Sequence, residues 1–141
     1  MRKCEVFNAQ QIPLNVEMFQ KLCDYVLKRE KREGTLNVVF VGLEEISEYN
    51  RYRKKEGPTD VLSFEGDPPF LGEIYICPEY VKENAKYFKV PFEEEMIRVC
   101  IHGILHLLGY DHERDEKDAE KMFDIQERYV ADFSTFFDKS S

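Results

Sequence analysis

Three histidines, all that the chain contains, lie within one segment of eleven residues, His102-Gly-Ile-Leu-His106-Leu-Leu-Gly-Tyr-Asp-His112. His102 and His106 are four residues apart, which places both imidazoles on one face of a helix, one turn from each other. Two ligands held in this way by a rigid helix can bind one metal ion. His112 would lie about 15 Å further along an uninterrupted helix, but Gly109 allows the chain to turn back toward the pair. We therefore predict a metal site formed by His102, His106 and His112.

The ligand types indicate which metal this site would take. Three neutral imidazoles suit Zn²⁺ best, although Ni²⁺, Co²⁺ and Cu²⁺ also bind imidazole. Three protein ligands leave a fourth position open, which is typical of a catalytic zinc ion. Cys100 would point away from His102 on the same helix, whereas Asp111 and Glu113 remain possible as a fourth ligand or as acceptors that orient an imidazole. We expect an open site.

The spacing HxxxHxxGxxH is that of the metzincin proteases, whose motif begins His-Glu. In this chain Gly103 stands where those enzymes place the glutamate that activates water. The metal-binding pattern is therefore present without the peptidase's base, which weighs against ordinary peptide hydrolysis, because carbonyl attack and amine departure both need a proton carrier.

The elements that must position these residues can be read from the apolar pattern. We expect strands at 4–8, 36–41, 61–64 and 71–77, and helices at 15–32, 44–55, 79–88, 92–108 and 115–133, with Gly34 ending the first helix and Gly109 the fourth. The length of 141 residues, 43% of them hydrophobic, is typical of one domain spanning 1–141. Together these patterns predict an α+β fold, a small mixed sheet of about four strands with helices packed on it, with the zinc site on a central helix and the following turn.

Composition excludes several classes of protein. The net charge of −8 argues against polybasic nucleic-acid binding, but residues 28–55 hold eight bases against five acids and predict a basic strip that carries Arg53. No apolar run could span a bilayer, and the N-terminal residues lack the apolar core of a signal peptide. Four cysteines stand far apart, and Cys77 and Cys100 lie in apolar stretches as small hydrophobes. We expect a cytoplasmic protein with no membrane partner.

Three sequence blocks resemble one family. The segment HGILHLLGYDH is similar to the signature of the YbeY family, bacterial single-strand-specific metallo-endoribonucleases tied to ribosome maturation. Residues 50–64, NRYRKKEGPTDVLSF, resemble the family's second block, in which an arginine precedes a Pro-Thr-Asp/Asn-Val-Leu-Ser-Phe strand. Residues 71–74, LGEI, resemble its LGD-I segment, with Glu where Asp is commoner. The blocks and their order cover most of residues 36–130.

The resemblance implies a function. His102, His106 and His112 would bind one zinc ion, and Arg53 would bind phosphate, for which the planar guanidinium fork is suited. The implied activity is zinc-dependent, single-strand-specific endoribonucleolytic cleavage in 16S rRNA 3′-end maturation and ribosome quality control. The implied partners are single-stranded or ribosomal RNA and the small ribosomal subunit with its assembly factors. Zinc would polarise the phosphate or activate water, and the RNA 2′-hydroxyl is the alternative nucleophile.

Other residues and other functions stay open at this point. Asp111 is a candidate proton carrier, Tyr110 could shape the pocket or stack on a base, and Glu127 could reach the site but better fits a solvated face. Ser63 has no identifiable base beside it and is not expected to be a nucleophile. The alternatives are a metzincin-like peptidase or small-molecule hydrolase with a displaced general base, or a non-catalytic ribosome-assembly factor whose metal is structural.

Overall fold

The computed structural model describes residues 1–111 and 115–140, with side chains as far as residue 133. Its elements, in chain order, are β1 (Arg2–Asn8), α1 (Val16–Arg29), β2 (Gly34–Phe40), α2 (Leu43–Tyr52), β3 (Val61–Glu65), β4 (Phe70–Ile76), α3 (Pro78–Phe88), α4 (Phe92–Leu107) and α5 (Glu116–Ser140). His112 and Glu113 therefore lie outside the described residues.

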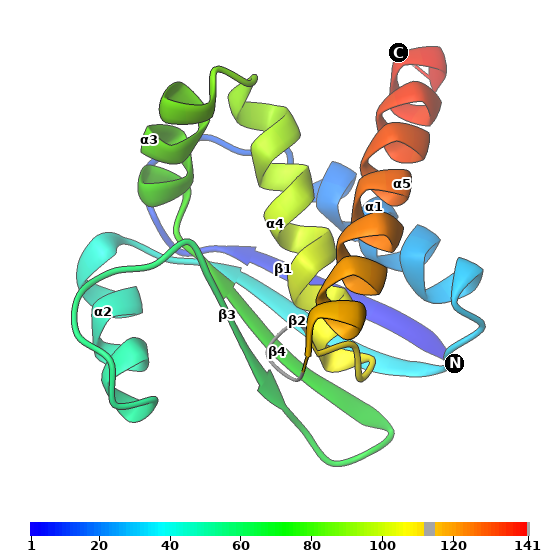
Figure 1. Cartoon of the computed structure of the whole chain (residues 1–141), viewed down its shortest axis with the longest axis horizontal. Helices are drawn as coiled ribbons and strands as arrows, with labels where there is room; N and C mark the ends of the chain where they lie inside the picture. The colour runs from blue at the N-terminus through cyan, green and yellow to red at the C-terminus, as the bar shows by residue number, and fades with distance from the viewer. Residues whose placement is uncertain (112–114, 141) are drawn as a thin grey trace.

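The strands form one mixed sheet of four strands in the order β1-β2-β4-β3 (Figure 1). β2 pairs in parallel with both β1 and β4, whereas β3 pairs antiparallel with β4. The parallel pair β1–β2 requires a crossover, which α1 supplies, and the short loop after β3 suffices for the antiparallel pair. The predicted α+β fold is confirmed.

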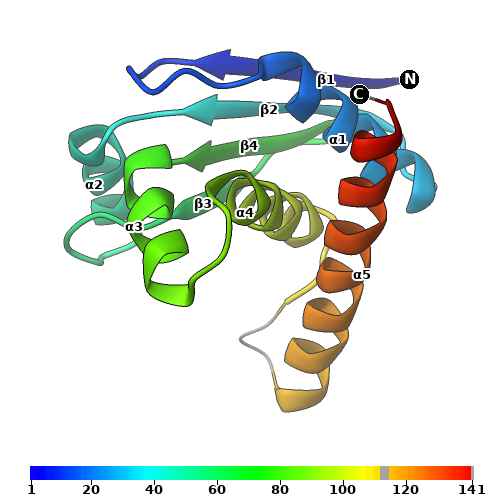
Figure 2. The same cartoon turned by 90° about the horizontal axis from the view of Figure 1, so that it is seen from above.

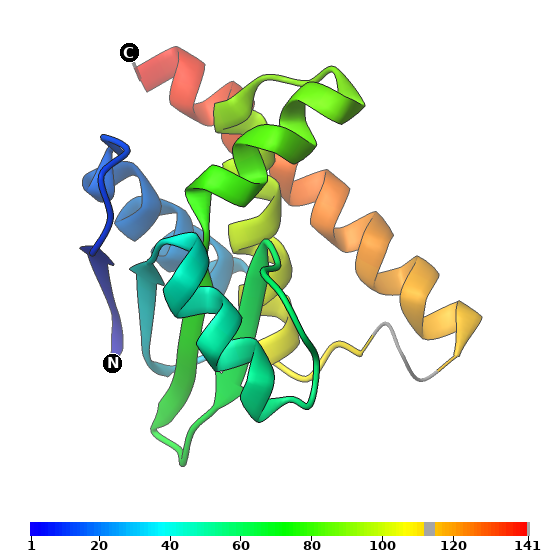
Figure 3. The same cartoon turned by 90° about the vertical axis from the view of Figure 1, so that its left-hand side faces the viewer.

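The sheet buries one face against α1 and α4. In β2 the residues alternate, so Leu36, Val38 and Phe40 are fully buried in the main core. α4 packs against β3, β4, α1 and α5, and it lies between the sheet and α5 (Figures 1 and 3). α2 covers part of the opposite face, where Tyr49 stacks on Tyr75 with ring centroids 4.3 Å apart. The helix that carries the histidines is thus held on several sides.

Several predicted boundaries differ from the structure: β1 and β2 each begin two residues earlier than predicted, and α2 ends at Tyr52 rather than at residue 55. Gly34 does not end the first helix but begins β2; α1 ends at Arg29, and Lys31 turns the chain with a φ of 55°. The last helix extends beyond the predicted residue 133 to Ser140.

Of the cysteines, Cys77 and Cys100 are fully buried, as predicted. No helix in the described part of the chain has the length and apolar character needed to cross a membrane.

Candidate functional site

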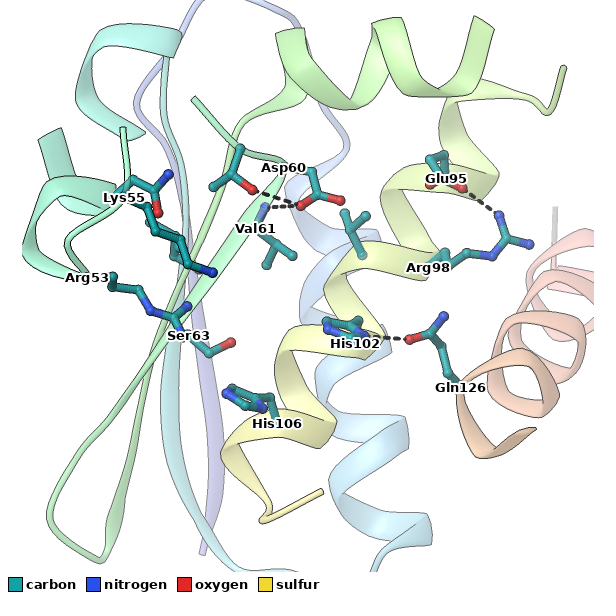
Figure 4. A pocket seen from close by; sticks show the side chains of 14 residues that line it. Arg53, Lys55, Asp60, Val61, Ser63, Glu95, Arg98, His102, His106 and Gln126 are labelled. Atoms are coloured by element: carbon teal, nitrogen blue, oxygen red, sulfur yellow. Dashed lines mark hydrogen bonds and ion pairs between the residues drawn. The ribbon is translucent and has the colours of Figure 1, made fainter. Parts of the chain in front are cut away.

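α4 presents two imidazoles to one cavity. His102 and His106 are both half-buried and lie one turn apart on the helix, as the four-residue spacing predicts. Both line a cavity of about 340 Å³, together with residues of β3, of α5 and of the loop that follows α2 (Figure 4). The cavity combines two imidazoles, two cations at the end of α2 (Arg53 and Lys55) and two carboxylates (Asp60 and Glu95). The structure therefore brings Arg53 to the histidines, although about 50 residues separate them in sequence.

The hydrogen bonds of the imidazoles fit metal binding. His106 Nδ1 lies 3.2 Å from the backbone oxygen of Tyr110. A carbonyl oxygen only accepts hydrogen bonds, so Nδ1 carries the proton and Nε2 carries the lone pair that a metal needs. His102 Nδ1 lies 2.8 Å from Gln126 Oε1, across the contact between α4 and α5. Partners of this kind orient metal-binding histidines in proteins.

The chain turns after α4 where the sequence predicts. Gly109 has a φ of 103°, in the left-handed region that glycine adopts without strain. Its amide bonds to the His106 carbonyl, and that of Tyr110 bonds to the Leu105 carbonyl, which closes the last turn of the helix. The third expected ligand, His112, lies outside the described residues, within which no three candidate ligands gather around one point. The three-histidine zinc site therefore stays a prediction, of which the structure places two members.

Arg53 and Lys55 are positioned by a buried asparagine. Arg53 caps the end of α2, and the amides of both residues bond to the Asn50 carbonyl. The Asn50 side chain donates to the Gly57 carbonyl at 3.0 Å, which ties the loop back to the helix. Among the described residues, Arg53 and Lys55 make no salt bridge, and Figure 4 shows both side chains directed to the same side of the cavity. Their charges are thus available to an anion; the sequence reasoning identified Arg53 but missed Lys55.

The third cation of the cavity, Arg98, is neutralised. Its guanidinium contacts Glu94, Glu95 and Glu127, at 2.6 Å for Glu95 and 2.9 Å for Glu127. The hydrogen bonds that Arg98 donates to Glu127 and Glu95 raise the pKa of its guanidinium, although burial opposes this. Arg98 is therefore a link between α4 and α5 rather than a free binding group, unlike Arg53.

Gly103, the residue that replaces the metzincin glutamate, faces the sheet. A Cβ built at this position would lie 2.7 Å from Ile74 Cγ2 and 3.2 Å from Ser63 Oγ, closer than ordinary packing allows. The Ser63 hydroxyl donates to the Gly103 carbonyl at 3.1 Å and so joins β3 to α4. Ser63 lines the cavity, but this bond gives it a structural part, consistent with the expectation that it is not a nucleophile. A base cannot come from position 103 in this packing.

Several other candidates lie elsewhere. Asp111 and Tyr110 line a separate hollow beside Glu30, and the Tyr110 hydroxyl donates to Glu30 at 2.7 Å. Glu127 is not on a solvated face but bonds to Arg98; its neighbour Gln126 reaches the cavity instead. The carboxylates that do line the cavity are Asp60 and Glu95, which the sequence reasoning missed.

The predicted basic strip divides into two groups. Arg32, which follows α1, lines the separate hollow and donates to the Leu108 carbonyl, whereas Arg53 and Lys55, which follow α2, line the histidine cavity. α1 and α2 are toward opposite sides of the molecule in Figures 1 and 2. The expectation of one continuous strip is wrong, because nearness in sequence did not produce nearness in the fold; only the part that contains Arg53 serves the cavity.

Together the fold and the cavity define a candidate active site that combines two imidazoles with the exposed cations Arg53 and Lys55. Comparisons with known proteins agree: the family model described as endoribonuclease YbeY matches residues 5–134. A curated endoribonuclease YbeY from Thermotoga neapolitana is 50% identical over 108 residues, 76% of this chain and 72% of the relative. One from Petrotoga mobilis is 40% identical over 132 residues, 90% and 92% of the two chains. A solution structure of a Thermotoga maritima protein matches with a TM-score of 0.70 and 36% identity, covering 97% of this chain and 93% of the other.

The chain therefore belongs to the endoribonuclease YbeY family, whose members are hydrolytic nucleases. This confirms the family resemblance found in the three sequence blocks and the assignment of the chain as an enzyme.

Proposed function

We propose that the protein is a zinc-dependent, single-strand-specific endoribonuclease that acts in 16S rRNA 3′-end maturation and ribosome quality control. One observation carries the proposal: a single cavity holds His102 and His106 from α4 and Arg53 from the end of α2. Family membership supports RNA as the substrate. The ribosomal assignment rests on the resemblance of the sequence blocks, and it implies the small ribosomal subunit as partner in the cytoplasm.

The described residues fit zinc through the chemistry of their donors. His102 and His106 would hold the ion through Nε2, with His112 as the third ligand. When bound, zinc polarises a phosphate oxygen and lowers the pKa of water. Arg53 binds the phosphate through its planar fork and stabilises the negative charge that develops there. Lys55 adds a second positive charge at the same edge of the cavity.

The exposed cations at the edge of the cavity favour the binding of an RNA strand there. Arg53 and Lys55 are exposed, so a strand can approach them from solvent with its backbone phosphates first. The chain carries 28 acidic residues, which repel nucleic acid away from this edge. Binding would thus be local, salt-sensitive and weak toward duplex DNA. The peptidase alternative is disfavoured by Gly103, because the packing against Ile74 leaves no room there for a glutamate side chain.

The test compares two lysines that are neighbours in sequence. Lys55 lines the cavity, whereas Lys54, which is also exposed, is not part of its wall. Cleavage of a single-stranded RNA by rigorously purified protein should fall strongly in Arg53→Ala, by about 10²-fold or more, as for other groups that stabilise developing charge. Lys55→Ala should cleave more slowly than Lys54→Ala, which should match the unsubstituted protein. Undiminished cleavage by Arg53→Ala would contradict the proposal, and cleavage of peptides with inert RNA would support the peptidase.

A further inference from the structure

Gln126 occupies a position that an apolar residue would be expected to fill. It lies on the face of α5 that packs against α4, where Met122, Tyr129 and Val130 are buried with it. Only 7% of the Gln126 surface is exposed. A buried amide costs free energy unless its hydrogen bonds are satisfied, so a glutamine here requires specific partners.

The partners of Gln126 determine which way its amide points. Gln126 Nε2 donates to Glu127 Oε2 at 3.2 Å, while Oε1 lies 2.8 Å from His102 Nδ1. A carboxylate only accepts hydrogen bonds, so the amide nitrogen must face Glu127 and the amide oxygen must face His102. Because that oxygen also only accepts, His102 Nδ1 must carry a proton.

Arg98 fixes Glu127 in this arrangement. Its Nε and one terminal nitrogen donate to the two carboxylate oxygens at 2.9 and 3.1 Å, a two-point contact with a defined plane. Partial burial opposes ionisation of Glu127, but the hydrogen bonds from Arg98 and Gln126 outweigh it and hold the pKa of that carboxyl below its ordinary value. The carboxylate therefore stays an acceptor at neutral pH, and the amide cannot turn over without losing a bond at each end.

We propose that Gln126 is a positioning residue that holds His102 with its proton on Nδ1 and its lone pair on Nε2, the form in which the ring binds a metal ion through the cavity. The consequence for metal binding rests on the proposed zinc site, but the tautomer is a property of the chain alone. Partners that fix the tautomer of a metal-binding histidine typically contribute about 10- to 100-fold in metal affinity.

His106 provides an internal control. Its Nδ1 bonds to the backbone oxygen of Tyr110, which is not on α5. A substitution at Gln126 should therefore change the tautomer of His102 and leave that of His106 unchanged. If α4 itself were disturbed, both rings would change.

The direct experiment is nitrogen NMR of the histidine rings in metal-free protein, at a pH where both rings are neutral. In the unsubstituted protein, His102 and His106 should both carry the proton on Nδ1. Gln126→Met keeps the length of the side chain but removes the acceptor, so His102 alone should lose this preference. Gln126→Glu loses the donor to Glu127 but keeps an oxygen acceptor toward His102, so Nδ1 of His102 should still carry a proton. Val130→Ala, which loosens the packing of the same helix but removes no hydrogen-bond partner of His102, should leave both rings as they are.

Zinc affinity, measured by competition with a chelator, tests the consequence for binding. Gln126→Met should bind zinc about 10- to 100-fold more weakly than the unsubstituted protein, whereas the affinity of Val130→Ala should stay close to that of the unsubstituted protein. A proton on Nε2 of His102 in the unsubstituted protein, or an unchanged tautomer in Gln126→Met, would overturn the inference. If the unsubstituted protein showed the expected tautomer but bound no zinc, the proposed function would fail while the positioning of His102 by Gln126 would stand.

Discussion

Substituting Gly103 by alanine probes the close packing that places the histidine face of α4 over the sheet. The new methyl carbon would lie 2.7 Å from Ile74 Cγ2 and 3.2 Å from Ser63 Oγ. Ile74 is fully buried and β-branched, so its side chain has little freedom to move away. Overpacking of this kind costs about 1–3 kcal/mol, and the rigid neighbour places this case in the upper part of that range. The higher helix propensity of alanine offsets about 1 kcal/mol of this loss of stability. The net expectation is a loss of about 1–2 kcal/mol of stability.

Urea unfolding of metal-free protein measures this loss as a lower midpoint with an unchanged slope. The same substitution made in Ile74→Ala protein identifies the contact responsible. The Cγ2 methyl is absent there, so Gly103→Ala should become neutral or stabilising by up to about 1 kcal/mol. Ile74→Val keeps a Cγ2 methyl and serves as the matched control, in which the loss should persist. If Gly103→Ala alone stabilised the protein, as at an unhindered helix position, the reasoning about this contact would be refuted.

Two further predictions concern the loop after α2 and the link between α4 and α5. Asn50→Ala should destabilise the protein by about 1–3 kcal/mol, because the Gly57 carbonyl loses the donor that ties the loop to α2. The same substitution should slow RNA cleavage, because the loop no longer holds Arg53 in place. Unfolding and cleavage assays on the same preparation check both effects. The pKa of Glu127 is lowered in the folded protein, so its contribution to stability is complete above the unfolded value of about 4.3 and is lost as the pH falls through the folded value. Glu127→Gln should therefore flatten the acid side of a plot of unfolding free energy against pH, and an unchanged plot would show that the bond to Arg98 contributes nothing.

Much of the fold could be predicted because its signals are local. The β-branched run of β2 and the helical spacing of His102 and His106 depend on neighbours in sequence; the strand was placed to within two residues and the two histidines on one helix. The end of α1 was not, because glycine is favoured just past helix ends and Gly34 looked like such a stop, whereas Lys31 makes the turn. A positive φ at a lysine has no sequence signature.

The walls of the cavity were harder to predict because they are assembled across the fold. Lys55, Asp60 and Glu95 are charged residues among many others, and only the docking of α4 against β3 brings them together. Gln126 did carry a usable signal: it lies at helical spacing from Met122, Val130 and Phe133, on the apolar face of an otherwise acidic helix. A polar residue at such a position indicates a buried partner, although the sequence does not say that the partner is His102.

The central claim is that the cavity on α4 is a metal-dependent site for RNA cleavage. In its most direct test, a chelator removes the metal from rigorously purified protein, and one equivalent of zinc is then added back. At each stage circular dichroism measures the fold, and cleavage of a single-stranded RNA measures the activity. The prediction is that the stripped protein keeps its fold and loses cleavage, that zinc restores cleavage, and that His106→Ala does not recover. Undiminished cleavage by the stripped protein, or full activity of His106→Ala, would contradict the claim; unfolding on removal of the metal would instead show a structural ion.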